Sequence, residues 1–195
     1  MTTSFASPLF EGNLVRLTPL DHDKDAEVVA AWTHNTEFMR MYSLQPVRPL
    51  TAAQVKKQFE QNDKEMDEGR RLFHYAIRTK DGDRLVGEAR IEWIEWTNGT
   101  AAVKIGLPDP ADRRNGFGGE VLGMLLRFAF RELNLHHLEV VLPEYNVPAL
   151  RFFEKHGFKI EVRRRQAVNR GGRRWDLIHM AILRPEWEAS HERQK

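Results

Sequence analysis

Cysteine is absent from this 195-residue chain. Its absence excludes disulfides, thiolate metal sites and a cysteine nucleophile. Long apolar runs are also missing: no stretch of the sequence approaches the ~18 consecutive apolar residues that a membrane-spanning helix needs. The first eight residues lack the basic start and continuous apolar stretch of a signal peptide. We therefore expect a soluble, cytoplasmic protein with no membrane partner.

A strong charge of either sign is missing as well. The 30 basic residues nearly balance the 28 acidic ones, and the net charge of +2 is too small to argue for nucleic-acid binding. The eight histidines show neither the H-x-x-x-H nor the H-E-x-x-H spacing, so no metal is predicted. What is present is a globular composition, 41% apolar and 30% charged, at a length that fits a single domain over residues 1–195.

Alternation of apolar residues and turn signals divide the chain into elements. Strands are predicted at 12–20, 73–79, 84–96, 101–107, 138–142, 158–168 and 175–183, and helices at 26–32, 51–66, 117–133 and 147–156. Asp81-Gly82 and Asn98-Gly99 are hairpin signals. This order predicts one mixed α/β layer structure without repeats or linkers.

The most informative segment lies between a predicted strand and a predicted helix, and reads Arg113-Arg114-Asn115-Gly116-Phe117-Gly118-Gly119. The three glycines remove side chains where the turn tightens, so that backbone N–H groups point into one cavity. With the positive end of the helix dipole they form a phosphate or pyrophosphate site. The segment is not a P-loop, since no Lys-Ser or Lys-Thr follows, and Val121 breaks the dinucleotide fingerprint. A purely structural turn is the alternative interpretation.

A second block, Asn146 to Phe158, makes a family resemblance specific. Arg113-x-x-Gly116-x-Gly118 resembles the acetyl-CoA pyrophosphate motif of GNAT acetyltransferases, and Asn146-x-x-Ala149 with Phe153-Glu-Lys-x-Gly-Phe resembles the N-x-x-A/S…Y-E-K-x-G-F segment of that family. The likeness extends over nearly the whole chain. The segments 12–20, 130–136 and 172–180 resemble the ribosomal-protein alanine N-acetyltransferase-like (RimJ/RimL type) subgroup.

The resemblance implies the GNAT fold, in which helices flank a central, mixed and mostly antiparallel sheet with splayed strands at the CoA site. It implies acetyl-CoA as cosubstrate and no metal. The pantetheine arm is expected along the backbone of Lys104, Ile105, Gly106 and Leu107, and the diphosphate on N–H groups of residues 114–119. Asn146 is expected to hold pantetheine with its side-chain amide, although it also suits a helix cap.

One departure from the family concerns the acid that protonates the departing CoA sulfur. The usual tyrosine is Phe153 here, and the serine of other members is Ala149. A thiol has a reference pKa near 8.5, so releasing thiolate at pH 7 costs only about 2 kcal/mol. Because a positioned acid typically contributes roughly 10²–10⁴-fold, its loss slows turnover without abolishing it. Tyr145 is a candidate substitute.

The other candidate catalytic residues are carboxylates. Glu88 and Glu92 share one face of a predicted strand, and either one is a candidate base that acts on the amine through water. Asp176 lies at a position that is frequently acidic in the subgroup, where it would orient the amine or pair with an arginine. Trp32, Phe38, Met39, Met41 and Tyr42 are candidates for the wall of the acceptor pocket or for the core.

The resemblance therefore implies an N-acetyltransferase that moves an acetyl group from acetyl-CoA directly to a primary amine, either a protein N-terminus or a small amine. Transfer is direct because no cysteine exists to form an acyl-enzyme. The alternative, favoured by Phe153 and Ala149, is a catalytically silent acyl-CoA-binding regulatory module.

The arginine-rich segment Arg163–Arg174 is either a solvated hairpin or a docking face for an acidic or nucleoprotein surface, which also leaves an RNA-binding adaptor open. By family analogy, a homodimer through the C-terminal strands is a further expectation.

Overall fold

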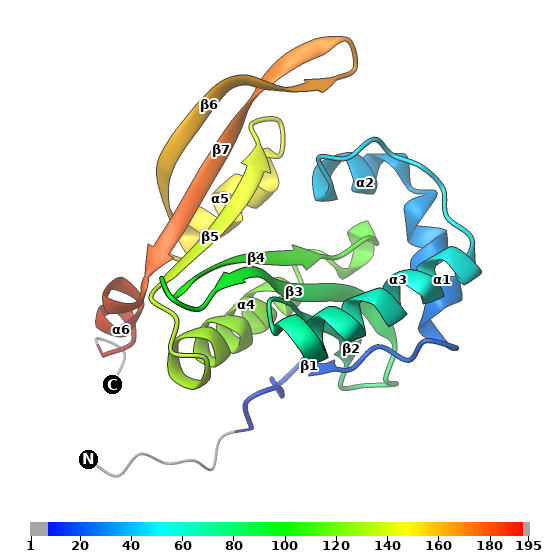
Figure 1. Cartoon of the computed structure of the whole chain (residues 1–195), viewed down its shortest axis with the longest axis horizontal. Coiled ribbons are helices and arrows are strands. Elements are labelled where there is room, and N and C mark those ends of the chain that lie inside the picture. The colour runs from blue at the N-terminus through cyan, green and yellow to red at the C-terminus, as the bar shows by residue number, and fades with distance from the viewer. Residues whose placement is uncertain (1–7, 193–195) are drawn as a thin grey trace.

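The computed structural model describes residues 8–192, with side chains to residue 190. Its centre is a seven-stranded sheet in the order β1-β2-β3-β4-β5-β7-β6 (Figure 1). The strands are β1 Val15–Thr18, β2 Phe73–Thr79, β3 Leu85–Glu95, β4 Thr100–Gly106, β5 His137–Pro143, β6 Lys159–Arg170 and β7 Arg173–Leu183. Only β4 and β5 pair in parallel, and all other neighbours are antiparallel. The predicted mixed, mostly antiparallel sheet is thereby confirmed.

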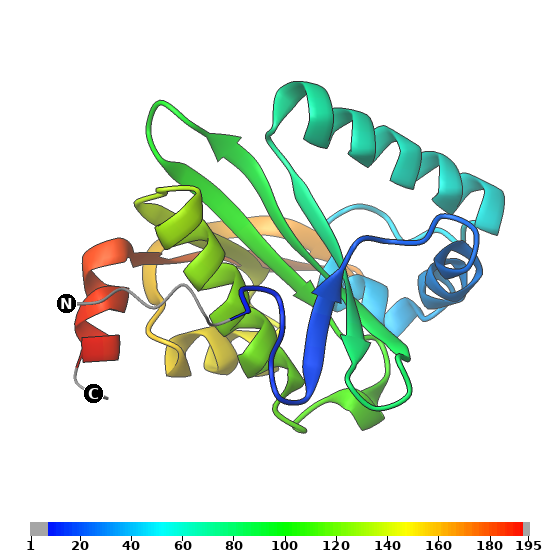
Figure 2. The ribbon, with the colours of Figure 1, turned by 90° about the horizontal axis from the view of Figure 1, so that it is seen from below.

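Helices cover both faces of this sheet (Figure 2). They are α1 Asp25–Thr33, α2 Thr36–Tyr42, α3 Ala52–Lys64, α4 Phe117–Arg127, α5 Val147–Lys155 and α6 Arg184–Glu192, with short helical turns at Glu65–Gly69, Pro110–Asp112 and Phe128–Glu132. Helix α3 lies on one face of the sheet, whereas α4 and α5 lie on the other. No described helix is long and apolar enough to cross a membrane.

Two helices were not predicted from the sequence. Helix α2 begins immediately after α1, because the extended backbone of Asn35 breaks the helix and its side chain then caps the next one by accepting a hydrogen bond from Phe38 N at 3.0 Å. Helix α6 follows β7 directly, with Pro185 in its first turn. The first strand is also shorter than predicted, since only Val15 to Thr18 pair with β2.

The apolar core lies between the sheet and α4. Its members include buried side chains of odd-numbered positions in β2, β3 and β4, Val86 and Ile94 near the two ends of β3, and one stripe of α4, among them Ile77, Ala89, Ile91, Val103, Val121, Leu122 and Leu125. A second, smaller cluster joins α1 to α3 and includes Val29, Val55 and Phe59. Because side chains alternate across a strand, His74 of β2, the even-numbered positions 88–92 of β3 and Lys104 of β4 face α2 and α3 instead.

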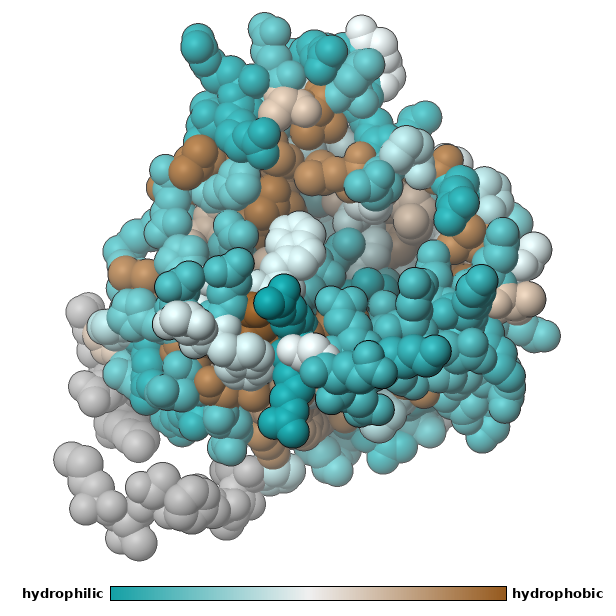
Figure 3. All heavy atoms as spheres, in the orientation of Figure 1, coloured by the Kyte–Doolittle hydropathy of each residue, from teal (hydrophilic) through white to brown (hydrophobic). Residues whose placement is uncertain are grey.

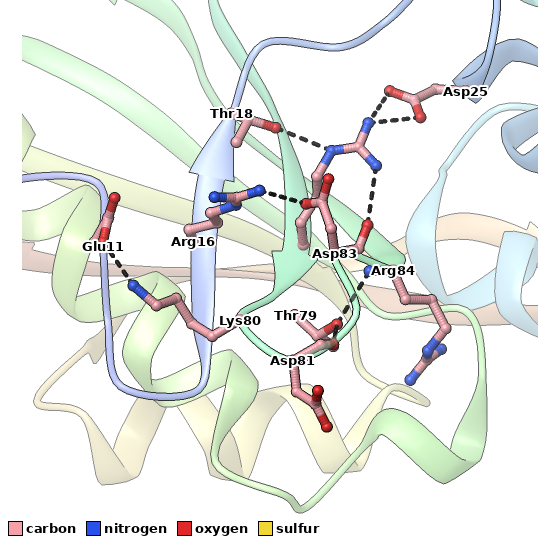
Figure 4. A network of polar contacts seen from close by, with 10 residues as sticks. Glu11, Arg16, Thr18, Asp25, Thr79, Lys80, Asp81, Asp83 and Arg84 are labelled. Carbon is pink, nitrogen blue, oxygen red and sulfur yellow. Dashed lines mark hydrogen bonds and ion pairs between the residues drawn. The ribbon is translucent and has the colours of Figure 1, made fainter.

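Ion pairs fix the edge of the sheet to α1 (Figure 4). The guanidinium of Arg78 on β2 lies 2.7 Å from both carboxylate oxygens of Asp25, at the start of α1, and donates to Thr18 Oγ1 at 3.2 Å. Arg16 on β1 pairs with Asp83 in the β2–β3 turn at 2.7 Å. Since Asp25 is only 2% exposed, its pairing with Arg78 is a buried one that sets where α1 begins.

The close approach of β3 to β4 depends on Gly87, where an added Cβ would lie 2.1 Å from Gly106 O. We predict that Gly87→Ala lowers the free energy of unfolding by about 1–3 kcal/mol, because the two strands must move apart. The matched control is Gly123→Ala in α4, where a Cβ meets nothing within 4 Å. This control should raise stability by about 0.5–1 kcal/mol. Urea denaturation measures both, and equal effects would contradict the packing described.

Candidate functional site

The sheet opens between β4 and β5. Their parallel pairing covers Thr100 with His137, Ala101 with Leu138 and Ala102 with Glu139. Beyond these pairs β5 continues along β7, whereas β4 runs toward α2 (Figure 1). Among the described strands, none pairs with the β5-facing edge of β4 residues 103–106. This edge therefore presents free backbone donors and acceptors, which is the arrangement that receives an added strand-like ligand.

The glycine-rich turn lies at the end of the same strand. The side chain of Arg113 donates to Leu107 O and Pro108 O, both at 2.9 Å, and Asn115 Nδ2 donates to Ala111 O at 2.7 Å. These bonds fold the loop back on itself. Arg114 has a φ of 65° and Gly116 a φ of 88°, so the chain enters α4 from the left-handed region.

The first turn of α4 presents the backbone N–H groups of Phe117, Gly118 and Gly119, which have no acceptor within the helix. A Cβ at Gly118 would lie 3.5 Å from Phe152, and one at Gly119 would lie 3.4 Å from His156 Nε2. Both distances are ordinary van der Waals contacts, so α5 packs closely against the start of α4. The predicted anion site is built from these N–H groups and the helix dipole.

A polar cluster occupies the α2–α3 face of the sheet, and we define it as His74, Glu88, Arg90, Lys104 and Tyr42. His74 Nε2 lies 2.7 Å from Glu88 Oε2, and Arg90 Nη2 lies 3.2 Å from the same oxygen. His74 is 4% exposed and Glu88 6% exposed. Glu88 stands opposite Gly106 and Arg90 opposite Lys104 in the β3–β4 register, so the cluster lies beside the opening.

Hydrogen bonds and burial set the charges in this cluster. Asn62 Nδ2 donates to His74 Nδ1 at 3.1 Å, which leaves the proton on Nε2, from where it is donated to Glu88. Burial lowers the pKa of His74 and outweighs the opposing effect of Glu88, so the imidazole is neutral at pH 7. Burial alone would raise the pKa of Glu88, but the charge of Arg90 and the hydrogen bond from His74 hold it well below its usual range. Glu88 is therefore a buried, compensated anion.

Lys104 and Tyr42 form the part of the cluster nearest α2. The Lys104 ammonium lies 4.2 Å from the centroid of the Tyr42 ring, and Tyr42 stacks on Phe38 with centroids 5.0 Å apart. A Cβ at Gly106 would lie 2.7 Å from the Tyr42 ring, so the glycine allows α2 to pack on β4. Tyr42 and Phe38 thus pack on β4 beside the polar cluster, and their role as a wall of the acceptor pocket stays a prediction.

The end of α2 bridges the opening. Its C-terminal carbonyls accept hydrogen bonds from residues that follow β5: Tyr145 Oη donates to Arg40 O at 2.8 Å and Asn146 Nδ2 to Met41 O at 3.1 Å. Arg170 Nη2 donates to the carbonyl oxygens of Ser43 and Gln45 at 3.0 and 2.9 Å. The loop after α2 is thereby held to the β5–α5 loop and to the tip of the β6–β7 hairpin.

A recess remains on this face of the molecule. Figure 3 shows the surface hollowed between the β6–β7 hairpin and helices α2 and α3. Between the loop after α2 and the hairpin tip lies a cavity of about 370 Å³, lined by Arg40, Pro46, Val47 and residues 169–172. Within the described side chains, no group of three or more His, Cys, Asp or Glu is placed to hold a metal ion.

The remaining predicted site residues lie in different surroundings. Asn146 is buried and does two things, since its Oδ1 accepts from Ala149 N at 3.3 Å as a helix cap while its amide holds α2. Phe153 is 5% exposed and packs in the core against Phe158. Asp176 accepts from Arg163 at 2.9 Å and from Gln166 N at 2.9 Å, so it orders the β6–β7 hairpin.

Glu92 differs from Glu88 although both share one strand face. Glu92 is half-buried and stands opposite Ala102, where the β4–β5 pairing ends. No hydrogen bond or ion pair engages its carboxylate in the described part of the chain. The structure therefore separates two carboxylates that the sequence left equivalent: one is buried and paired, and the other is accessible and uncommitted.

Comparisons with known proteins agree with this geometry. Residues 15–159 match the family model of the acetyltransferase (GNAT) domain. The chain is 26% identical to the probable N-acetyltransferase YjcK of Bacillus subtilis over 92% of this chain and 99% of that protein. It is 25% identical to the uncharacterized N-acetyltransferase YnaD of the same organism, over 84% of this chain and 91% of that one.

Two solved structures share the fold at low identity. Spermidine N-acetyltransferase from Vibrio cholerae, in complex with CoA and spermine, superimposes with a TM-score of 0.78 at 18% identity, covering 89% of this chain and 98% of that one. RimL, a ribosomal L7/L12 alpha-N-protein acetyltransferase in complex with coenzyme A, gives a TM-score of 0.78 at 16% identity, covering 88% and 95%.

The hydrogen bond from Tyr145 to α2 can be tested by removing the Tyr145 hydroxyl. Tyr145→Phe keeps the ring beside Trp175 but deletes the hydrogen bond to Arg40 O, which is worth about 0.5–1.5 kcal/mol. We predict that amide hydrogen exchange in α2 speeds up by roughly 2–12-fold, the Boltzmann factor of that energy. Tyr75→Phe is the control, because Tyr75 packs beside Phe128 on the opposite face. Unchanged exchange in α2, or an equal change in the control, would show that this hydrogen bond does not hold the helix.

Proposed function

This chain belongs to the GNAT acetyltransferase family and is an acyl-CoA-dependent acetyltransferase, and from that premise we propose that it transfers an acetyl group from acetyl-CoA directly to a primary amine. The acceptor we propose is a protein N-terminus or a small amine. The observation that carries the proposal is the unpaired edge of β4, which lies next to the glycine-rich N-terminus of α4. Acetyl-CoA supplies the acetyl group as a thioester, and this chain's residues bind, position and exchange protons.

The residues present fit this cosubstrate. The free backbone edge of β4 from Val103 to Leu107 suits a pantetheine arm, whose amides pair as a strand's do. The N–H groups of Phe117, Gly118 and Gly119 suit a diphosphate. Asn146 directs its amide to α2, so we assign it to shaping the mouth of the site through Met41 O. Two enzymes that share this fold were solved with CoA, which supports acetyl-CoA as the cosubstrate.

We assign the base to Glu92. An ammonium acceptor must lose a proton before it attacks, and a carboxylate that acts through water can receive it. Glu92 faces the recess with an uncommitted carboxylate beside the point where β4 and β5 part. Glu88 already accepts hydrogen bonds from His74 and Arg90, and its lowered pKa makes it the weaker base. Its role is to hold Arg90 and to balance the charge of the cluster.

The part of the acceptor beyond its reacting amine would lie in the cavity at the hairpin tip. Arg40 and Arg170 line this cavity, and Arg164, Arg165 and Arg174 are exposed on the hairpin. Positive charge there favours an acceptor with acidic groups and disfavours a polyamine, in contrast to the spermidine enzyme that shares the fold. The hairpin is thus proposed as the docking face for an acidic peptide or nucleoprotein surface.

We also retain a homodimer as a proposal. Strand β6 is an edge of the sheet, and Ile160 and Val162 on it are 58% and 49% exposed. An exposed edge strand with apolar side chains is suited to pair with a second copy.

The first experiment measures binding and turnover with purified protein. We predict that acetyl-CoA raises the melting temperature, since a ligand at 100 times its Kd stabilises by about 2.7 kcal/mol. CoA should then be released in proportion to added amine, and faster with acidic peptides than with polyamines or aminoglycosides. Stabilisation without release from any amine would favour the silent binding module. No stabilisation at all would remove the basis of the proposal.

A pair of isosteric variants separates the two carboxylates. We predict that Glu92→Gln lowers kcat by roughly 10²–10⁴-fold with little change in melting temperature. Glu88→Gln should instead lower stability by about 3 kcal/mol, because it leaves Arg90 half-buried without its partner. Glu95→Gln is the control, since Glu95 is exposed beyond the bulge in β3. If Glu88→Gln is stable and inactive while Glu92→Gln is active, the assignment is reversed.

A further inference from the structure

The proposed reaction leaves one proton without a donor. When the thioester is cleaved, its sulfur leaves as a thiolate that must gain a proton. Phe153 and Ala149 carry no exchangeable side-chain proton, and Phe153 is closed into the core. The chain has three tyrosines and no cysteine, so each phenolic hydroxyl can be examined in turn.

None of the three tyrosines is a suitable acid at the opening. Tyr145 donates its proton to Arg40 O at 2.8 Å. Tyr75 lies on the α4 face, where it packs against Phe10 and Phe128. Tyr42 lies in the polar cluster, but burial and the nearby charge of Glu88 raise its pKa well above the ordinary value, which makes it a poor acid.

Lys104 is a further proton carrier at the opening, and unlike His74 and Arg90 it gives no hydrogen bond to Glu88. It follows Ala102 and Val103 on β4, so its backbone belongs to the edge that parts from β5, and its side chain lies on the recess face. The ammonium rests over the Tyr42 ring at 4.2 Å. Among the described residues, no carboxylate lies within 4.0 Å of Lys104 Nζ and no acceptor takes a hydrogen bond from it. A half-buried lysine that has neither an ion pair nor a hydrogen bond is rare in a folded protein, which points to a use.

We propose that Lys104 is the acid that protonates the departing CoA sulfur, in place of the tyrosine that this chain lacks; the inference rests on the acetyl transfer proposed above. In the step, the bond between the acceptor nitrogen and the acetyl carbon forms, the C–S bond breaks, and its electron pair stays on sulfur. The Lys104 ammonium gives one proton to that sulfur.

The protons balance over the cycle. The acceptor enters as an ammonium with three protons on nitrogen, and the amide product keeps one. Glu92 receives the first proton before attack and passes it to solvent. The neutral amine left on Lys104 takes the second from the acceptor nitrogen as the amide forms, which restores the ammonium. The sum is one proton to sulfur and one to solvent for each acetyl group transferred.

The surroundings of Lys104 adapt it to this role. An ordinary lysine has a pKa near 10.4 and a thiol near 8.5, so proton transfer to the thiolate would be uphill. Burial lowers the pKa of Lys104, Arg90 acts in the same direction, and the carboxylates of Glu92 and Glu88 oppose them. The groups that face it are those three from β3 and the Tyr42 ring from α2. Lowering its pKa brings donor and acceptor closer together, which is the condition for efficient acid catalysis.

Three variants test the proposal once wild-type turnover has been established, so that failure of the proposed function is recognised first. Lys104→Met removes charge and proton and should lower kcat by about 10²–10⁴-fold, with KM values changed less than about threefold. Lys104→Arg keeps the charge but holds its proton too tightly to donate it, and should be nearly as slow as Lys104→Met. Lys57→Met, on the exposed side of α3, should behave as wild type.

The pH dependence gives a second, sharper result. In the wild type, kcat should fall at high pH as the Lys104 ammonium loses its proton, and this alkaline limb should be absent from Lys104→Met. Wild-type kcat in Lys104→Arg would overturn the acid role in favour of charge alone. Stoichiometric acetylation of Lys104, seen by intact mass, would overturn it in favour of an acceptor lysine.

A measurement without acetyl-CoA tests the same residue independently of turnover. In protein labelled with ¹⁵N-lysine, the Nζ resonance that disappears in Lys104→Met belongs to Lys104. Its pH titration should give a pKa below that of the other lysines, while the melting temperatures of wild type and variant show that both are folded. A titration indistinguishable from that of Lys57 would overturn the proposal.

Discussion

The parting of β4 from β5 after Ala102 and Glu139 is the constraint on which the rest of the site depends. A sheet that stops pairing near its middle leaves backbone N–H and C=O groups that need partners. Here β5 is retained by β7, whereas β4 continues alone to the turn that starts α4. The free edge, the predicted anion site at the α4 N-terminus and the recess on the opposite face all meet at this one place, where the proposed function requires a cosubstrate and an acceptor to approach each other through the sheet.

Charge is distributed around this opening in a consistent way. Glu88 is buried, and only the pairing with Arg90 and His74 makes an ionised carboxylate tolerable there. That pairing engages the carboxylate of Glu88, which is why the proposed proton transfers are assigned to its neighbours. Glu92 and Lys104 lie on the same face, and among the described residues neither makes a hydrogen bond or an ion pair; the proposed mechanism uses Glu92 to accept a proton and Lys104 to give one. Helix α2 completes the enclosure, because Gly106 lets Tyr42 rest against β4 while Tyr145 and Asn146 hold the same C-terminal end of the helix.

Local signals in the sequence were sufficient for most of the fold but not for the polar cluster. The turn at 113–119, the Asp81-Gly82 hairpin and the Thr51 cap of α3 involve residues close in sequence, so their patterns predict them directly. The pairing of His74 with Glu88 depends on a bulge between Ile77 and Arg78, which shifts the β2–β3 register by one residue. A second shift, between Glu92 and Glu95, sets Lys104 opposite Arg90. A one-residue shift changes every cross-strand neighbour, and composition does not reveal it. Helix α2 is short, and tertiary contacts rather than periodicity stabilise it.

The central claim is that the opening between β4 and β5 is the cosubstrate site. The most direct measurement is a crystal structure of the protein with CoA. The account predicts that the pantetheine arm lies along residues 103–107 of β4, that the diphosphate contacts the N–H groups of Phe117 to Gly119, and that the sulfur ends beside Lys104. CoA bound anywhere else, or a β4–β5 pairing that closes over residues 103–106, would contradict it.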